Sequence, residues 1–355
     1  MARAAGPAAA RTEPSAPRGR RPPLALLPAL LVLLLAGGAA CTQPPPAPMR
    51  LGTVMWPGHE PLFLARESGQ LPDAQVRLVE YSSLSEVNRA FRNGALDAAG
   101  LTLDMALALA QQGFEPRVVL VMDISQGADA LLARPEVAQV RALRGRRVGV
   151  EESGVSGYVL GRALERAGLA ASDVQVVWTP VEQQVRAYRE GALDAVVSFE
   201  PVVGQLMAAG ARRLFDSSEL PGEVQDVLVV RRAYLDAHPA EVAALLDAWF
   251  AAADTVQARP QAASLELSPR LGMSAEEFRR VCTQLHFPSR EENLALLGGE
   301  RPGIVPIARR MYEVLLRLGL VRGAWPEAPL ADARALQGGA PRQVAAAGPG
   351  APWGR

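Results

Sequence analysis

An eleven-residue stretch occurs twice in this chain, and the two copies lie 97 positions apart. Residues 89 to 99 read RAFRNGALDAA and residues 186 to 196 read RAYREGALDAV, so eight of the eleven positions are identical. The same offset, applied without a gap, places Leu51-Gly52-Thr53 on Val148-Gly149-Val150, where two short apolar stretches open the two copies. Self-similarity at a fixed offset indicates one supersecondary unit built twice. We therefore expect two related units in the folded part of the chain.

Each copy alternates strand-like and helix-like segments. In the first copy the pattern predicts strands at 50–55, 75–80 and 96–100, with helices near 60–68 and 84–92. In the second copy it predicts strands at 147–151, 173–178 and 193–198, with helices at 156–167 and 181–189. Strands that alternate with helices at this spacing form mainly parallel sheets flanked by helices. The expected fold class is α/β.

The residues after the second copy are expected to return to the first unit. Strand-like segments at 118–122 and 227–230 flank the second copy, and we expect them to be two crossover strands between two lobes. Beyond them, apolar residues recur at helical spacing after His238 and again near 274–285 and 303–318, so these helices can cover the first sheet. The predicted boundaries are 49–124 and 227–330 for a discontinuous lobe 1, and 125–226 for lobe 2.

Both ends of the chain are predicted to lie outside the fold. Three arginines precede an apolar run at 24–36, and small residues then lead to Cys41. The run is shorter than the roughly 20 residues of a membrane-spanning helix, so residues 1–40 are interpreted as an export signal peptide. Cys41 is the predicted lipidation site, with plain secretion or an uncleaved anchor as alternatives. Residues 41–48 are expected to form a Pro-rich tether, and residues 331–355 are expected to be disordered.

Composition excludes several classes of protein. All 37 basic residues are Arg, and they balance 37 acidic residues. Without Lys, a P-loop lysine and a Schiff-base lysine are excluded, and a net charge of zero argues against nucleic-acid binding. Three His and two Cys share no metal-ligand spacing, and neither a G-x-S-x-G motif nor a catalytic triad occurs. We therefore expect no metal or cofactor, and the sequence offers no convincing catalytic nucleophile.

Short motifs in a fixed order carry a family resemblance. They are Trp56-Pro57-Gly58, Gly94-Ala95-Leu96-Asp97-Ala98-Ala99, Asp123-Ile124-Ser125-Gln126-Gly127-Ala128-Asp129, Leu143-Arg144-Gly145-Arg146-Arg147-Val148-Gly149-Val150-Glu151, Glu200-Pro201 and Asp226-Val227-Leu228-Val229-Val230. Together they resemble the solute-binding proteins of bacterial ABC importers, in the branch for nitrate, taurine, sulfonates and thiamine pyrimidines.

The resemblance implies a periplasmic binding protein-like clamp of two lobes that traps a small solute. Its expected partners are the solute, the permease and ATPase subunits of the importer, and a membrane reached through the lipid anchor. The chain is expected to be exported and monomeric. Delivery of the solute to a signalling receptor is the alternative. An enzyme of pyrimidine or menaquinone synthesis on the same fold is disfavoured, because such enzymes usually act in the cytoplasm.

Ligands of open parallel sheets collect at the carboxyl ends of the strands. The loops expected there are 55–61, 100–105, 123–129, 151–157 and 198–204, which together carry seven acidic residues and no Arg. A bare oxyanion is usually held by a guanidinium group. We therefore expect a nitrogen-containing solute that is cationic or zwitterionic, such as an aminosulfonate or an aminopyrimidine.

Candidate ligand contacts in these loops each have a structural alternative. Trp56 can stack on the solute or cover the local core, and Thr102 can donate a hydrogen bond or cap a helix. Glu200 can face the cleft or cap the next helix, and Asp129 and His59 are expected to have structural or surface roles. The predicted ligand-binding residues are Trp56, Thr102, Asp123, Ser125, Glu200 and, at a helix start suited to an anion, Gly154, Val155 and Ser156.

Overall fold

The computed structural model describes residues 47–152 and 154–338. These residues belong to one compact unit. The predicted signal peptide, Cys41 and most of the Pro-rich tether lie outside the described residues, as does the segment from 339 to the end. Among the described residues, no helix is long and apolar enough to cross a membrane.

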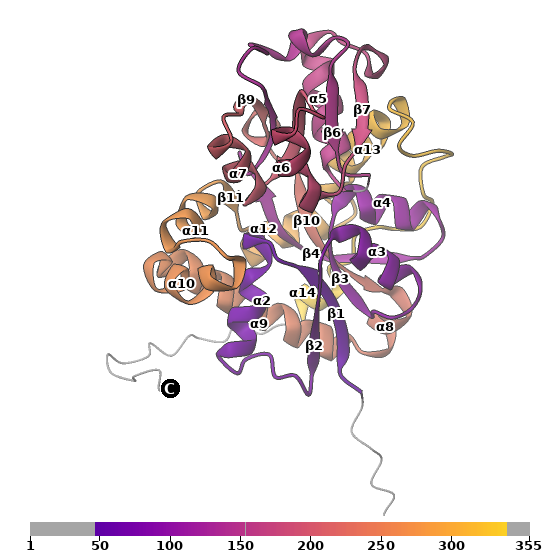
Figure 1. The fold of residues 1–355 in the computed structure, drawn as a ribbon. Coiled ribbons are helices and arrows are strands. Elements are labelled where there is room, and N and C mark those ends of the chain that lie inside the picture. Colours follow the sequence, from indigo (N-terminus) through magenta and orange to yellow (C-terminus); the bar gives the residue numbers. More distant parts are fainter. Residues whose placement is uncertain (1–46, 153, 339–355) are drawn as a thin grey trace, which may run out of the picture. The chain divides into compact units, whose positions relative to one another are not determined.

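Two mixed sheets, both visible in Figure 1, organise the described residues. The first has the order β11-β4-β10-β3-β1-β2. Its strands are β1 (Met49–Val54), β2 (Val76–Tyr81), β3 (Ala98–Thr102), β4 (Pro116–Ser125), β10 (Gln225–Arg231) and β11 (Leu285–His286). β1, β2 and β3 are parallel, whereas β10 runs antiparallel between β3 and β4. This insertion brings a late segment of the chain into the middle of the first sheet.

The second sheet has the order β7-β6-β8-β5-β9. Its strands are β5 (Asp129–Ala133), β6 (Arg147–Val150), β7 (Gln175–Trp178), β8 (Ala195–Phe199) and β9 (Arg212–Asp216). β6, β7 and β8 are parallel, and β5 is antiparallel to both β8 and β9. The three parallel strands of each sheet, β1-β2-β3 and β6-β7-β8, therefore have the same order, with the first strand of the three between the other two.

The sequence repeat corresponds to a repeated ion pair. Arg50 donates from Nη2 to Asp97 Oδ1 at 2.8 Å, and Arg147 donates to Asp194 at 3.0 Å in the same way. In each copy the backbone N–H of the arginine also donates to that aspartate at 2.9 Å. The recurring Gly-Ala-Leu-Asp motif is thus a tie between the first and third strands of each sheet, so its role is structural.

Helices flank both sheets. They are α2 (Glu60–Glu67), α3 (Leu84–Arg92), α4 (Leu103–Gln111), α5 (Ser156–Ala167), α6 (Val181–Arg189), α7 (Val202–Ala208), α8 (Arg232–Ala237), α9 (Pro239–Ala258), α10 (Pro260–Leu267), α11 (Ala275–Cys282), α12 (Arg290–Leu297), α13 (Ile304–Arg317) and α14 (Arg334–Gln337). At the first sheet, α2 packs with α9, and α3 and α4 lie on the other side (Figure 1). The predicted helices and strands of both copies are present, with boundaries within about two residues.

Two short segments join the sheets. The chain leaves the first sheet after Ser125 and returns to it at Gln225. The segments are tied together, because the hydroxyl groups of Ser125 and Ser217 lie 2.7 Å apart and the backbone N–H of Gly127 donates to Ser217 Oγ at 2.7 Å. The predicted crossover strands 118–122 and 227–230 correspond to β4 and β10.

The predicted disorder of residues 331–355 is wrong for residues 331–338. Ala331 bridges to Val118 of β4, and the short helix α14 follows. Ala335 and Leu336 are buried, and Arg290 donates to the carbonyl of Leu336 at 3.1 Å. A few apolar side chains are enough to hold this segment in place, because they pack against the apolar surface of β4 and α9.

Candidate functional site

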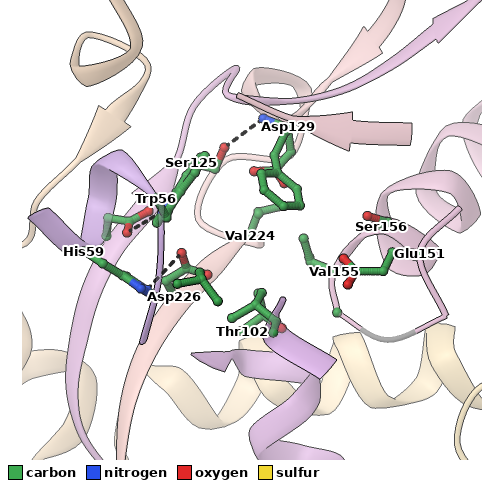
Figure 2. A pocket seen from close by; sticks show the side chains of 15 residues that line it. Trp56, His59, Thr102, Ser125, Asp129, Glu151, Val155, Ser156, Val224 and Asp226 are labelled. Atoms are coloured by element: carbon green, nitrogen blue, oxygen red, sulfur yellow. Dashed lines mark hydrogen bonds and ion pairs between the residues drawn. The ribbon is translucent and has the colours of Figure 1, made fainter. Parts of the chain in front are cut away.

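A pocket of about 480 Å³ lies between the two sheets. Its walls come from strand ends and helix starts of both sheets: Val54, Trp56, His59, Leu84, Thr102, Asp123, Ser125, Asp129, Glu151, Gly154, Val155, Ser156, Phe199, Val224 and Asp226. Figure 2 shows Trp56, His59 and Asp226 on one side and Glu151, Val155 and Ser156 on the other. Four of these residues are acidic and none is Arg.

Two aspartates on neighbouring strands share one wall of the pocket. Asp123 on β4 is paired in register with Asp226 on β10, and a hydrogen bond joins their carboxyl groups. Burial and the charge of Asp123 raise the pKa of Asp226 well above its usual value, and burial also raises the pKa of Asp123. Trp56 Nε1 donates to Asp123 Oδ2 at 3.2 Å, which favours the ionised form of Asp123. The pair therefore binds a proton more readily than isolated carboxyl groups do, and the indole N–H favours ionisation at Asp123 over Asp226.

Asp226 was not among the predicted contacts. Its motif was recognised in the sequence, but the side-chain direction depends on β10 lying next to β4. A close approach also shapes this wall, because a Cβ atom on Gly58 would meet Asp123 Oδ2 and Trp56 Nε1. The glycine of the Trp56-Pro57-Gly58 motif is thus required for the contact between the indole and the carboxylate.

Two further carboxyl groups lie at the second sheet. Asp129 begins β5, and its backbone N–H donates to Ser125 Oγ at 3.3 Å. Glu151 follows β6 and accepts from Ser85 Oγ of α3 at 3.4 Å, across the two sheets. Burial raises the pKa of Asp129 to about 6 and that of Glu151 to about 7. Among the described residues neither group has an ion-pair partner.

His59 is fully buried, in contrast to the surface position expected for it. Its Nδ1 lies 2.9 Å from Thr53 Oγ1, and its Nε2 lies 3.7 Å from Asp226 Oδ2 in the pocket wall. Burial lowers the pKa of His59 to about 3, so the imidazole is neutral at physiological pH. The absence of a side chain at Gly100 provides room for the ring, because a Cβ there would lie 2.9 Å from His59 Cε1.

An aromatic pair closes the pocket on another side. Trp56 and Phe199 meet edge to face with ring centroids 5.6 Å apart. Trp56 follows β1 of the first sheet and Phe199 ends β8 of the second, so the pair links the two sheets. Phe199 was not predicted, although it immediately precedes the quoted Glu200-Pro201 motif.

The start of α5 supplies the polar backbone of the pocket. Gly154, Val155 and Ser156 line it as predicted, and the helix that follows is 12 residues long. The first N–H groups of a helix and its dipole favour a negatively charged group. The pocket thus offers Asp123 and Asp226 on one side and, on the other, a helix start that lies beside Glu151.

Glu200 does not line this pocket. Its Oε2 accepts a hydrogen bond from the backbone N–H of Gly204 at 2.9 Å, so the structure supports the capping alternative. Glu60, another acid of the predicted loops, is paired with Arg270 at 3.1 Å. Thr102, in contrast, lines the pocket and makes no side-chain cap to α4.

No cluster of three or more His, Cys, Asp or Glu suited to a metal ion occurs among the residues that the structure describes. The pocket side chains are carboxylic acids, hydroxyl groups, one neutral imidazole, two aromatic rings and the aliphatic side chains of Val54, Leu84, Val155 and Val224. Such a set can bind an N–H-rich or cationic organic group through charge-assisted hydrogen bonds and ring contacts.

Sequence comparisons place the chain in a family. It matches the model of the NMT1-like family over residues 42–267. Over 211 residues it is 28% identical to a candidate aliphatic sulfonates-binding protein of Escherichia coli (strain K12). That match covers 58% of this chain and 65% of the relative, so it spans slightly less than two thirds of the relative's length.

Solved structures share the fold. The alkanesulfonate-binding protein of Xanthomonas axonopodis pv. citri, bound to MOPS, has a TM-score of 0.68 at 18% identity, over 81% of this chain and 98% of that chain. The desulfurization enzyme DSZB has a TM-score of 0.58 at 18% identity, over 82% and 98% of the two chains. These matches confirm the predicted two-lobe α/β fold. With more than half of its length matched by the family model, the chain belongs to the NMT1-like family.

Proposed function

We propose that this protein is the extracytoplasmic solute-binding component of an ABC importer. We also propose that its pocket holds a small nitrogen-containing solute, cationic or zwitterionic. The observation that carries the second proposal is the set of four acidic residues, Asp123, Asp129, Glu151 and Asp226, in a pocket lined by no Arg. Buried carboxyl groups without a cation are costly, and a ligand that brings the cation offsets that cost.

A protonated amine can be held by Asp123 and Asp226 while Trp56 and Phe199 contact its carbon atoms. A zwitterion can in addition place a sulfonate at the N-terminus of α5, near Gly154 and Ser156. The relative from Xanthomonas axonopodis pv. citri was solved with MOPS, which combines a sulfonate with a basic nitrogen. An aminosulfonate is therefore consistent with the sulfonate-type ligands of the similar proteins, and its amine is complementary to the acidic lining of the pocket.

We favour binding over catalysis, although a desulfurization enzyme shares the fold. The hydroxyl of Ser125 lies 2.7 Å from that of Ser217, and its oxygen also accepts from the N–H of Asp129, so it is engaged at the joint between the sheets. His59 directs one ring nitrogen to Thr53 and the other to the side of Asp226. Among the described residues, no hydroxyl group of the pocket is thus paired with a general base as nucleophilic catalysis requires.

Calorimetric titration and thermal shift with a ligand panel test the proposed solute class. The panel contains amines, aminopyrimidines, aminosulfonates, alkyl sulfonates and nitrate. We expect saturable binding of an amine or aminosulfonate, and a loss of about 1.5 to 3 kcal/mol in Asp123→Asn, the usual size for hydrogen bonds to charged groups. Glu200→Gln, a buried acid outside the pocket, is the matched control. Binding of nitrate or an alkyl sulfonate alone, unaffected by Asp123→Asn, would contradict the proposal.

We further propose that the protein is exported and anchored through acylated Cys41, which lies outside the described residues. Small residues precede this cysteine in the sequence, although Gly38 stands where such signals more often have Leu. Expression in a bacterial host should give a membrane-bound form that incorporates labelled palmitate, and Cys41→Ser should abolish the label. Persistent labelling of Cys41→Ser would contradict the anchor.

A further inference from the structure

A second pocket, of about 530 Å³, adjoins the first. It lies among α3 and α4 of the first sheet, the region of β7 and α5 at the second sheet, and the segment after α13. Its lining is Asn88, Asp104, Met105, Ala108, Glu151, Glu152, Gly154, Gly157, Trp178, Leu315, Leu320 and Val321. Glu151 and Gly154 line both pockets, so the two pockets adjoin at these residues.

One side chain of the second pocket is a buried acid that no cation neutralises. Asp104 is 8% exposed, and its Oδ1 has no hydrogen-bond partner among the described residues. Burial raises the pKa of Asp104 to about 6, against the opposing effect of the Thr102 hydroxyl and the first N–H groups of α4. The Oδ1 of Asn88, in the same lining, also lacks a partner among the described residues. Both oxygens are buried hydrogen-bond acceptors without a partner among the described residues, so an N–H group placed beside either of them would supply a hydrogen bond that is now missing.

The remaining wall of this pocket is apolar. Met105, Leu315, Leu320 and Val321 line it, and the Trp178 side chain stands half exposed beside them. A pocket with acceptor oxygens on one side and hydrocarbon on the other fits the end of an aliphatic amine. It does not fit an anion.

Electrostatic interactions connect the two pockets. The charge of Asp104 contributes to the raised pKa values of Asp129 and Glu151, which line the first pocket. Like charges that repel one another through a low-dielectric interior favour a ligand with positive charge at more than one place. The row of carboxyl groups thus extends from Asp123 and Asp129 past Glu151 to Asp104.

We propose that the second pocket is a subsite of the same ligand site, and that the solute is an elongated molecule with two protonated nitrogens. This inference rests on the proposed function. One nitrogen is held by Asp123, Asp129 and Asp226 in the first pocket. The other reaches Asp104 in the second pocket, and the carbon chain between them passes Glu151 and lies against Met105 and Leu320.

Calorimetry with α,ω-diaminoalkanes of increasing length, each compared with the monoamine of the same length, tests the inference. We expect diamines to bind about tenfold to hundredfold more tightly than the matched monoamines once the chain is long enough to reach Asp104. Asp104→Asn should remove this advantage, and because the charge of Asp104 also acts on Asp129 and Glu151, it should weaken monoamine binding much less than diamine binding. Ala108→Phe, which fills the second pocket without altering charge, should do the same, and Glu200→Gln should retain the advantage.

The possible outcomes separate this inference from the proposed function. Monoamine binding without any advantage of the diamines, or an advantage that survives both Asp104→Asn and Ala108→Phe, overturns the second subsite and leaves the first pocket as a site for a single cation. Binding of neither amine class overturns the second subsite, and if the aminosulfonates also fail to bind, the proposed solute class is overturned as well.

Discussion

Buried carboxyl groups determine the chemistry of the pocket at the scale of single residues. Burial raises the pKa of Asp129 from 3.8 to about 6 and that of Glu151 from 4.5 to about 7. In the unfolded chain both groups return to values near 4. The folded protein therefore binds more protons than the unfolded chain between about pH 4 and pH 7. The stabilising effect of these groups is complete below this window and is lost as the pH rises through it.

Asp129→Asn should stabilise the ligand-free protein in alkaline solution. Because Asn does not titrate, the variant avoids burying a charge, and we expect it to be more stable than the parent by roughly 1 to 3 kcal/mol at pH 8. The difference in stability between the variant and the parent should vanish near pH 4. Melting temperatures of both proteins between pH 4 and pH 8 measure it. As a control of opposite sign, Asp194→Asn should destabilise at pH 8, since Arg147 lowers the pKa of Asp194. A stability difference for Asp129→Asn that does not change with pH would contradict this account.

Gly58→Ala should disturb the pocket without removing any functional group. The added Cβ meets Asp123 Oδ2 and Trp56 Nε1, so one of these side chains must move. We expect a stability loss of about 1 to 3 kcal/mol, the usual range for overpacking, together with weaker ligand binding. Gly338→Ala is the control, because a Cβ there meets nothing within 4 Å and φ is −81°. Unchanged melting temperature and ligand affinity in Gly58→Ala would show that this close approach is not required.

At the scale of elements, α5 is the helix that connects the ligand site to the rest of the molecule. Its start lines both pockets, and its Gly157 and Gly161 face the segment that follows α13. A Cβ on Gly157 would lie 2.7 Å from Leu320 Cδ1, and one on Gly161 would meet Leu318 Cδ1. Arg162 of α5 also donates to Glu223 at 2.8 and 3.0 Å. The segment after α13 thus holds α5 in position from outside the second sheet.

Gly161→Ala should destabilise the protein, although Ala favours helices by about 1 kcal/mol over Gly. The added methyl group must displace Leu318, and we expect the overpacking to cost about 1 to 3 kcal/mol. Combining Gly161→Ala with Leu318→Ala should recover part of this loss, because the methyl group then has room. Leu316→Ala, at a side chain that is 45% exposed, is the matched control for truncation of a leucine. A Gly161→Ala variant that is more stable than the parent protein against heat or denaturant would contradict the close packing of Gly161 against Leu318.

At the scale of the whole described molecule, two sheets meet around a pocket to which both contribute. The contacts of Trp56 with Phe199 and of Ser85 with Glu151 cross between the sheets. The connecting segments are short and are tied at Ser125 and Ser217. Closure by a hinge at these segments, with ligand between the sheets, is the motion that such an arrangement permits.

Small-angle scattering should show a smaller radius of gyration with saturating ligand than without it. In the proposed binding mode the ligand bridges acids of both sheets, which draws the sheets together. At the same ligand concentration, the Asp123→Asn variant should have the radius of gyration of the ligand-free protein, because its affinity for the ligand is reduced. An unchanged scattering profile at full occupancy would indicate a rigid site.

The sequence by itself determined the two related units, most helices and strands, and the acidic character of the strand-end loops. These features depend on residues close together in the chain: apolar periodicity, loop composition and the copied Gly-Ala-Leu-Asp motif. The location of Trp56, Thr102, Asp123, Ser125 and the start of α5 in one pocket also followed, because the carboxyl ends of parallel strands gather at one edge of a sheet.

Only the tertiary structure decided which loop side chains face the pocket. Asp226 lies beside Asp123 because β10 runs antiparallel next to β4, a pairing of residues about a hundred positions apart. The carboxylate of Glu200 accepts a hydrogen bond from the N–H of Gly204, and the imidazole of His59 is buried next to Gly100. Asp104 lines a second pocket. The physical reason is that side-chain direction depends on strand order, register and neighbouring packing, none of which is encoded within a single loop.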